Sequence, residues 1–304
     1  NLLASQCAAM AQLPLVKADF HELKDWLEPR EIQEVLERQP RFIRPDMASL
    51  KRTVLGVILP ACYFLARILP RAKRYEAQSV WPTSAVCSAW AFLSVFALAA
   101  ASCRNPGVVP QAATPQPMSR PARYVVVNGV QVKQKWCATC RVFRPLRSKH
   151  CSLCDRCVFR FDHHCTWLGN CVGLGNYRSF LLLVVASTAF FGHSTIITFK
   201  VLWRTFLEAD PRPVLRAFAV QNCLELLYAA YAISMFFVFG VLILYHSTII
   251  AINLTTNEHV RDYYLYNDRN PFDQTCMENY HQVFCAPYGR PRQDDHPSST
   301  VEPV

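Results

Sequence analysis

The stretch "CATCRVFRPLRSKHCSLCDRCVFRFDHHCTWLGNC" (137–171) decides the fold of the middle of this chain. Its 35 residues contain seven cysteines and three histidines at short spacings. Two residues separate the members of each Cys-x2-Cys unit, and at that spacing a single turn presents two sulfurs to a tetrahedral zinc ion. The stretch is too polar to form an apolar core, so bound metal would have to supply its folding energy. The pattern therefore predicts a small domain built around zinc.

The number of donors exceeds what two zinc ions need. Two closed tetrahedral sites take eight ligands, and the stretch offers ten. Two sites of three cysteines and one histidine would leave one cysteine and one histidine over, which is the minimum set for a thiolate nucleophile. The count does not say which pair is left over. A set of ligands that uses all seven cysteines and one histidine also satisfies it.

Outside this stretch the chain is apolar. Of its 304 residues, 52% are hydrophobic and only 18% are charged, against roughly 25% charged in ordinary soluble domains. Three apolar stretches carry no charge over the roughly 20 residues that cross a bilayer. A fourth, the first along the chain, is shorter and contains Pro60 and Arg67. The four stretches lie at 53–69, 77–103, 179–199 and 226–257.

Loop charges predict the orientation of these four spans. From Arg104 to Tyr177 the chain has eleven lysines and arginines against two acids, an excess typical of cytosolic loops. The fold class is then a mainly α, polytopic membrane protein, with four transmembrane helices and a cytosolic two-zinc domain between the second and the third. The expected divisions are a cytosolic N-terminal region (1–52), helices 1 and 2 (53–103), the cysteine-rich domain (104–177), helices 3 and 4 (178–254) and a cytosolic C-terminal region (255–304).

Three shorter segments carry local signals. Phe20, Leu23 and Leu27 share one face of a predicted N-terminal helix. The alternation around Asn128-Gly129 predicts a β-hairpin. The polar tail from about Asn267 predicts mostly loop. The net charge of +10 favours an anionic partner.

At this point the residues resemble a known family. From 135 to 180 the chain is similar to the DHHC family of protein S-acyltransferases (palmitoyltransferases), with the letters "DHHC" (162–165) unaltered. Thr166 stands where a proline commonly follows the cysteine. Three further segments, in the order found in the family, resemble its other motifs: "NPG" (105–107), where Asn105 replaces the usual Asp, "TTNE" (255–258) and "NPFDQTCMENY" (270–280).

The resemblance implies a ligand assignment that the donor count leaves open. One zinc site would be Cys137, Cys140, His150 and Cys157, and the other Cys151, Cys154, His164 and Cys171. Cys165 would then be the nucleophile, His163 its base, and Asp162 the acid that orients the imidazole. Supporting roles fall to Thr255, Thr256, Glu258 and Asn279.

The resemblance also implies the reaction and its participants. A long-chain fatty acyl group, palmitoyl first of all, would pass from acyl-CoA to protein cysteines through an acyl-Cys165 intermediate. The partners would be palmitoyl-CoA or a similar acyl-CoA, substrate proteins with cytosolic cysteines near the membrane, and the lipid bilayer. The location would be the Golgi, the endoplasmic reticulum or the plasma membrane, with the active site facing the cytosol. Candidate contacts to acyl-CoA are Trp167, Arg144, Arg147, Lys149 and Phe190.

Alternatives stand beside this interpretation. The basic residues also fit membrane orientation alone, and Phe190 also fits ordinary helix packing. A catalytically silent zinc-finger membrane scaffold would use the same domain to recruit proteins, but the intact His163–Cys165 pair favours an enzyme. A zinc module for nucleic acid is the third function, and the segment between the ligands has no pattern of a recognition helix, so no nucleic-acid partner is expected.

Overall fold

The computed structural model describes residues 43, 45–75, 83–111, 116–208, 220–264 and 270–285. The N-terminal helix predicted around Phe20 lies outside these residues, as does the end of the tail predicted to be loop. The chain divides into two compact units. One, here called the cysteine-rich unit, comprises 100–178 with the described residues before 48 and after 244. The other, the helical unit, comprises 48–99 and 179–244.

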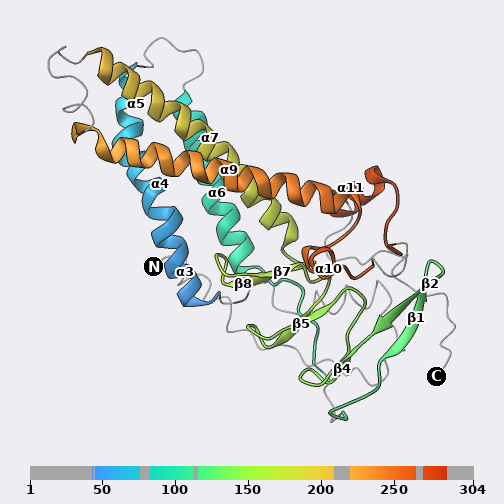
Figure 1. Cartoon of the computed structure of the whole chain (residues 1–304). Helices are drawn as coiled ribbons and strands as arrows, with labels where there is room; N and C mark the ends of the chain where they lie inside the picture. The colour runs from blue at the N-terminus through green and yellow to red at the C-terminus, as the bar shows by residue number, and fades with distance from the viewer. Residues whose placement is uncertain are drawn as a thin grey trace. The chain divides into compact units, whose positions relative to one another are not determined.

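Four described helical segments are long and apolar enough to cross a membrane (Figure 1). The prediction of four transmembrane helices with a cysteine-rich region between the second and third is therefore confirmed. The first segment, Met47–Arg74, is longer at both ends than the apolar stretch 53–69, because flanking polar residues continue the helix. The other three are α6 (Thr83–Cys103), α7 (Tyr177–Leu207) and α9 (Cys223–Ala251).

The first segment is continuous but not uniform. It consists of α3 (Met47–Thr53), η1 (Val54–Ile58), α4 (Leu59–Tyr63), η2 (Phe64–Ile68) and α5 (Leu69–Tyr75), where η1 and η2 are π-helical. Each π-helical turn ends two residues before a proline, Pro60 or Pro70. Proline has no N–H to donate to the carbonyl four residues earlier. The Gly56 carbonyl, which would have bonded Pro60, instead accepts the Tyr231 hydroxyl at 2.5 Å.

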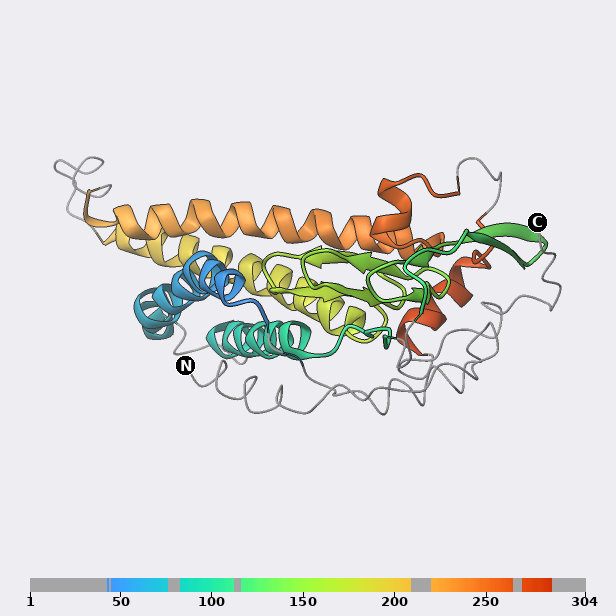
Figure 2. The same ribbon diagram turned by 90° about the horizontal axis from the view of Figure 1, so that it is seen from below.

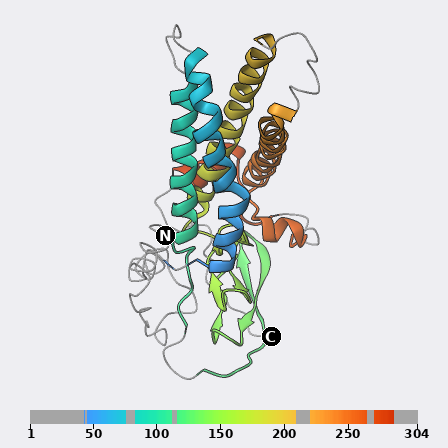
Figure 3. The ribbon, with the colours of Figure 1, turned by 90° about the vertical axis from the view of Figure 1, so that its left-hand side faces the viewer.

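The four segments of the helical unit are drawn as ribbons in Figure 3. All four contribute residues to its apolar core. Phe64 packs edge-on against Phe190 of α7, with ring centroids 5.8 Å apart. On its other side it stacks on Tyr228 of α9 at 5.4 Å. Cys87 and Ala91 of α6 are buried in the same core cluster. One ion pair in this unit, Arg71 to Glu225 at 2.7 Å, links α5 to the first turn of α9.

The cysteine-rich unit is built from antiparallel hairpins, seen from below in Figure 2. The first confirms the prediction around Asn128-Gly129, both of which have positive φ as a tight hairpin turn requires. Its strands are β1 (Arg123–Val127) and β2 (Val130–Gln134). The other strand pairs are β3 (Trp136–Cys137) with β4 (Val142–Phe143), β5 (Lys149–Cys151) with β6 (Arg156–Val158), and β7 (His163–Cys165) with β8 (Asn170–Val172).

Two short helices complete this unit: α10 (Thr256–Val260) and α11 (Cys276–Phe284). The second lies in the tail that the sequence predicted to be mostly loop. Its start is stabilised by a capping box, in which Thr275 and Glu278 bond each other's backbone N–H groups. Tyr280 then ties it to the end of α9 through a hydroxyl bond of 3.0 Å to the Ser247 carbonyl. The capping residues lie at the start of the helix itself, whereas Ser247, which holds the helix, lies 33 positions before Tyr280.

Candidate metal centres and catalytic site

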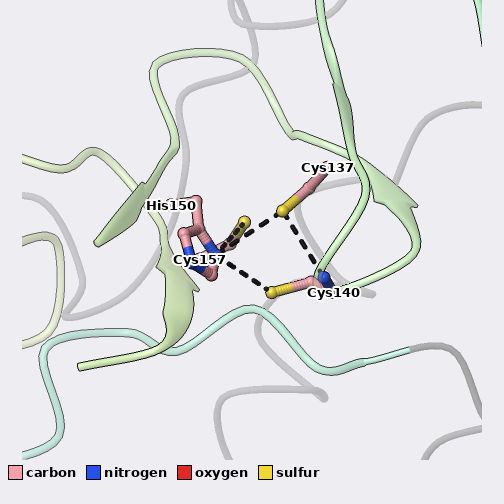
Figure 4. A group of neighbouring side chains, drawn as sticks. All are labelled: Cys137, Cys140, His150 and Cys157. Carbon is pink, nitrogen blue, oxygen red and sulfur yellow. Dashed lines mark hydrogen bonds between the residues drawn. The ribbon is translucent and has the colours of Figure 1, made fainter. Parts of the chain in front are cut away.

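The first metal centre draws on two hairpins. Cys137 and Cys140 come from β3 and the turn after it, and His150 and Cys157 are cross-strand partners on β5 and β6. The four ligand atoms lie within 4.8 Å of one another. The distances from His150 Nδ1 to the three sulfurs are 3.5, 3.4 and 3.9 Å (Figure 4). A tetrahedral zinc ion with ordinary bond lengths separates sulfur and nitrogen ligands by about 3.6 Å, so this donor set fits zinc.

The second centre repeats the arrangement one hairpin later. Cys151 and Cys154 come from β5 and its turn, while His164 and Cys171 are cross-strand partners on β7 and β8. His164 Nδ1 lies 3.6, 3.4 and 3.7 Å from the three sulfurs. Both centres could therefore hold a metal ion, each through three thiolates and one imidazole. In the first centre, Asp155 Oδ1 also lies 3.5 Å from the far nitrogen of His150, where a carboxylate would orient a ligating ring.

Strand alternation explains why the two ligand sets interleave along the chain. Successive side chains on a β-strand point to opposite faces. On β5, His150 therefore faces the first centre and its neighbour Cys151 faces the second. A ligand set that kept consecutive residues together would need both side chains on one face. The hairpin thus contributes two ligands to each centre.

The same alternation separates the two histidines of β7. His164 faces the second metal centre, and so His163 and Cys165, its neighbours on either side, point to the other face of the strand. The donor count from the sequence left this division open. The structure brings together in each metal centre the four residues that the family resemblance assigned, and leaves His163 and Cys165 outside both.

Asp162 is held from two directions. It is 3% exposed, and its Oδ2 lies 2.6 Å from Nδ1 of His163. Its Oδ1 accepts the backbone N–H of Thr256 at 2.8 Å. Thr256 is the first residue of α10, so the carboxylate also lies at the positive end of a helix. With Nδ1 bonded to the acid, the other ring nitrogen of His163 is the one that can serve Cys165.

The charges of the three groups support one another. Burial by itself would favour neutral His163, but its hydrogen bonds with Asp162 and Cys165 outweigh that effect and raise its pKa to about 9. Burial would likewise raise the pKa of Cys165, yet the bond and charge of His163 lower it. The pKa of Asp162 is also lowered by His163, against its burial. Both shifts act in the same sense, so the arrangement favours a Cys165 thiolate beside a His163 imidazolium.

The segment "TTNE" builds the helix end that meets Asp162. Thr255 caps α10 by accepting the Glu258 N–H, and Glu258 bonds the Thr255 N–H in return. Glu258 also forms an ion pair of 2.7 Å with Arg147, and both side chains are 4% exposed. Arg147 donates further bonds to Asn253, at 3.0 and 2.8 Å. These residues therefore form one buried network that joins the β4–β5 loop to α10.

This network changes the expectation for Arg147. As a contact for the phosphates of acyl-CoA, its guanidinium would need to face solvent. It is instead buried, and Glu258 and Asn253 take its N–H groups. No local sequence pattern indicates this pairing, because 111 positions separate Arg147 from Glu258.

The other candidate contacts lie in different surroundings. Lys149 donates to Asn257 at 2.8 Å and, with Arg144, lines a cavity of about 110 Å³. Trp167 is 54% exposed in the turn between β7 and β8. Phe190 is buried in the core of the helical unit. The cavity also has basic residues that sequence reasoning missed, because they lie on β2, between β2 and β3, and after α10: Lys133, Lys135 and Arg261.

Two asparagines that the sequence analysis did not single out anchor the β7–β8 hairpin. Asn170 donates from Nδ2 to the carbonyls of Ala101, Ser102 and Arg104 at the end of α6, at 3.4, 3.0 and 2.9 Å. Asn176 donates to Ala101 at 3.0 Å. These amides satisfy carbonyls that a helix end leaves without partners. The polar letters of "GNCVGLGN" (169–176) were the signal available for them.

The remaining motif residues have structural partners. Asn105 accepts the N–H groups of Gly107 and Val108 at 2.9 and 3.0 Å, a task that its amide oxygen performs as an aspartate would. Asn279 is 1% exposed. It donates to the Ala251 carbonyl at 2.8 Å and to Asp273 at 2.7 Å, and so ties α11 to the end of α9.

Comparison with known proteins gives consistent matches. A family model described as DHHC palmitoyltransferase matches residues 130–263. The chain is 33% identical over 274 residues to "Probable protein S-acyltransferase 7" of Arabidopsis thaliana, a match that covers 81% of this chain and 59% of that protein. It is 33% identical to "Palmitoyltransferase ZDHHC9" of Homo sapiens (70% and 64% covered) and 35% identical to "Palmitoyltransferase ZDHHC5" of Bos taurus (71% and 30%). The chain thus spans less than two thirds of the length of each of these relatives.

Proposed function

This chain belongs to the DHHC palmitoyltransferase family, and from that premise we propose that it transfers palmitoyl from palmitoyl-CoA to cysteine thiols of proteins through an acyl-Cys165 intermediate. One observation carries the proposal: β7 presents His163 and Cys165 on the face opposite the metal ligand His164, with Asp162 bonded to His163 at 2.6 Å. A scaffold that only recruited partners would not need a charged cysteine–histidine pair.

In the first half-reaction, the Cys165 thiolate attacks the carbonyl carbon of the thioester. The new bond joins the acyl carbon to the Cys165 sulfur, and the bond between that carbon and the CoA sulfur breaks. His163, as imidazolium, gives its proton to the departing CoA thiolate. Asp162 keeps the ring oriented throughout. The products are CoA thiol, acylated Cys165 and neutral His163.

The second half-reaction reverses these roles with a different thiol. Neutral His163 takes the proton of a substrate cysteine, whose sulfur attacks the acyl-Cys165 carbonyl. The Cys165 thiolate leaves, and the thiolate–imidazolium pair is restored. One thioester replaces another in each step, so acyl-CoA is the sole energy source required. The scheme predicts ping-pong kinetics.

We propose that the two metal centres hold zinc as structural ions. The residues are Cys137, Cys140, His150 and Cys157 in one centre, and Cys151, Cys154, His164 and Cys171 in the other. All four positions of each centre are taken by protein ligands, which is the pattern of structural rather than catalytic zinc. When bound, the ions would supply folding energy to hairpins that bury little apolar surface. The second ion would hold β7 and so the direction of His163 and Cys165.

Acyl-CoA has an anionic part, its phosphates, and an apolar part, its acyl chain. We propose that its phosphates bind at the basic cavity lined by Lys133, Lys135, Arg144, Lys149 and Arg261, where several cations converge. The acyl chain needs apolar surroundings, because each buried CH₂ contributes about 0.8 kcal/mol. We propose Phe190, in the helical core, as a residue near that chain. Trp167 is proposed to contact the ligand near the thioester.

Partners and location follow from the same scheme. The substrates would be proteins whose cysteines lie close to a membrane, and the second partner is the bilayer itself. The eleven basic residues of 104–177 favour the cytosolic side for the active site. We propose an endomembrane (Golgi or endoplasmic reticulum) or the plasma membrane as the location.

Labelling of the purified chain tests the acyl-enzyme. In detergent with radiolabelled palmitoyl-CoA, we expect label on the protein that hydroxylamine releases. The Cys165→Ser variant should lose the label, because an alcohol beside His163 is a poor nucleophile at neutral pH. The matched control is Cys276→Ser, which removes an exposed cysteine and should label normally. A Cys165→Ser protein that labels as well as the wild type would refute the nucleophile assignment.

A further inference from the structure

Asn170 lies directly opposite the nucleophile. On the β7–β8 hairpin its register partner is Cys165. Partners in an antiparallel pair carry their side chains on the same face, with Cβ atoms about 4.5–5.5 Å apart. The Asn170 amide therefore shares a face with the reacting sulfur, while its neighbour Cys171 faces the metal centre. Asn170 is 1% exposed.

The two ends of this amide have different environments. Nδ2 donates to three carbonyls at the end of α6. Since carbonyls accept only, these contacts identify the nitrogen and hence the oxygen of the amide. Oδ1 is buried and has no hydrogen-bond partner among the described residues. A buried acceptor without a donor costs free energy, so its retention beside the nucleophile points to a donor that arrives with a ligand.

The two substrates of the proposed reaction share such a donor. In CoA, the reacting sulfur is followed by two carbons and then an amide N–H. In a protein cysteine, the sulfur is also followed by two carbons, Cβ and Cα, and then the backbone N–H. Both sulfurs are bonded in turn to the same acyl carbon on Cys165. An acceptor beside Cys165 therefore meets the same S–C–C–N–H fragment in both half-reactions.

We propose that Asn170 Oδ1 accepts this amide N–H, from CoA as the leaving thiol and from the substrate cysteine as the attacking thiol. This inference rests on the proposed acyltransferase function and names what its thiol site recognises. It also defines a substrate class: the acceptor cysteine must have a backbone N–H that is not already used, as in an extended segment or a chain end. A cysteine inside a regular helix would not qualify.

The anchoring of Asn170 suits this role. Three hydrogen bonds to the end of α6 hold the amide group in one orientation, so little conformational entropy is lost when a ligand N–H binds. The turn between β7 and β8 joins Cys165 to Asn170 along the chain, and its residues Thr166 and Trp167 are exposed. Exposed turn side chains can rearrange at small cost when a thiol enters.

The test replaces the ligand N–H by oxygen. In the donor arm, wild-type protein in detergent is acylated in separate reactions by two compounds. S-palmitoyl-N-acetylcysteamine is the amide and carries the N–H. S-palmitoyl-2-mercaptoethyl acetate is the ester and carries an oxygen in place of the N–H. In the acceptor arm, palmitoyl is removed from Cys165 by N-acetylcysteamine or by 2-mercaptoethyl acetate. Each rate is divided by the uncatalysed rate of the same compound in buffer. We expect the amide to exceed the ester by about tenfold in both arms, the effect of one buried hydrogen bond.

Two variants connect this preference to the residue. Asn170→Ala should reduce the amide-to-ester ratio to near one in both arms, whatever happens to the absolute rates. Asn176→Ala is the matched control, because it also removes a donor to the Ala101 carbonyl but leaves Asn170 Oδ1 in place. Its ratio should equal that of the wild type. Because the readout is a ratio, a general loss of stability in either variant does not produce the expected result.

Each outcome has a consequence. A wild-type amide-to-ester ratio within twofold of one overturns the inference. An unchanged ratio in Asn170→Ala also overturns it. If Asn170→Ala does not fold, the wild-type ratio alone is the test. A preference in one arm alone overturns the shared recognition of both thiols. If palmitoyl-CoA does not acylate Cys165 in the wild type, the proposed function itself fails. If it does and no preference appears, only the role of Asn170 fails.

Discussion

At the scale of single residues, the reactivity of Cys165 depends on the charge of His163. Asp162 accepts from His163 Nδ1 and is in turn held by the Thr256 N–H. This arrangement raises the pKa of His163 to about 9, with burial acting in the opposite direction. The imidazolium then lowers the pKa of Cys165, again against burial. The acid therefore acts on the sulfur indirectly, through the ring between them.

The first prediction concerns the pH dependence of alkylation. Because the pKa of Cys165 is lowered, its thiolate persists to a lower pH than that of an ordinary cysteine and is lost as pH falls through that pKa. The Asp162→Asn variant removes the charge that stabilises the imidazolium, so the pKa of His163 falls and that of Cys165 rises. We expect the profile of Cys165 alkylation by iodoacetamide, followed by peptide mass spectrometry, to shift upward by roughly 1–3 pH units. Superimposable profiles would contradict the indirect role of Asp162.

At the scale of elements, the alternation of side chains along a strand gives neighbouring residues different roles. On β7, one face carries the metal ligand His164 and the other carries His163 and Cys165. On β5 the same alternation sends His150 and Cys151 to different centres. A register slip of one residue would exchange these faces. The register of β7 with β8 is therefore the feature on which both the proposed metal binding and the proposed chemistry depend.

Substitution of the two adjacent histidines tests this division. We expect His163→Ala to retain the zinc content of the wild type and to lose acylation by palmitoyl-CoA. His164→Ala should lose the zinc of the second centre and, with it, the ordered β7–β8 hairpin. Zinc is measured by mass spectrometry of the digested protein, and folding by resistance to limited proteolysis. Equal loss of zinc in the two variants would show that both rings are ligands.

The start of α10 provides a second prediction at this scale. Glu258→Gln leaves the buried Arg147 charge without its partner, and we expect a loss of roughly 3–5 kcal/mol in stability, with a lower thermal midpoint in detergent. The matched control is Glu225→Gln, since Arg71 is 37% exposed whereas Arg147 is 4% exposed. Solvent around Arg71 should make its effect smaller. An equal fall in midpoint for both variants would mean that burial of the pair is not the cause.

At the scale of the whole molecule, connectivity and charge together set the proposed topology. A helix that crosses the bilayer places its two ends on opposite sides, so Cys223 at the start of α9 and Cys276 after its end face different compartments. The basic segment 104–177 favours the cytosol for the side that carries the catalytic residues. Both cysteines are exposed and can therefore report on sidedness.

Labelling of sealed microsomes tests this orientation. We expect a maleimide–polyethylene glycol reagent added outside to modify Cys276 and not Cys223, because the outer face of such vesicles corresponds to the cytosol. After detergent is added, Cys223 should react as well. Each site is quantified by peptide mass spectrometry, with Cys223→Ser and Cys276→Ser as controls for assignment. Protection of Cys276 before detergent would invert the proposed topology.

From the sequence alone, the four long helices, the first hairpin and the presence of two metal centres could be predicted, whereas α11 could not. Apolar stretches, three of the four uncharged, predicted the helices, and the first helix exceeds its stretch because polar flanking residues also accept helical geometry. Asn128-Gly129 predicted the first hairpin, since its turn needs residues that tolerate positive φ. Cysteine spacing predicted two metal centres, but from the residues alone the choice between His163 and His164 stayed open. These signals are local, since each is contained in one continuous stretch of the chain.

Which distant residues meet became visible only in the folded chain. It paired Arg147 with Glu258 across 111 positions and buried both side chains. It gathered Lys133, Lys135 and Arg261 around one cavity and directed Asn170 to the end of α6. Spacing along the chain cannot reveal such contacts, because they depend on the path that the intervening elements take. The burial that makes an ion pair or an unpaired oxygen consequential likewise exists only once those elements have packed.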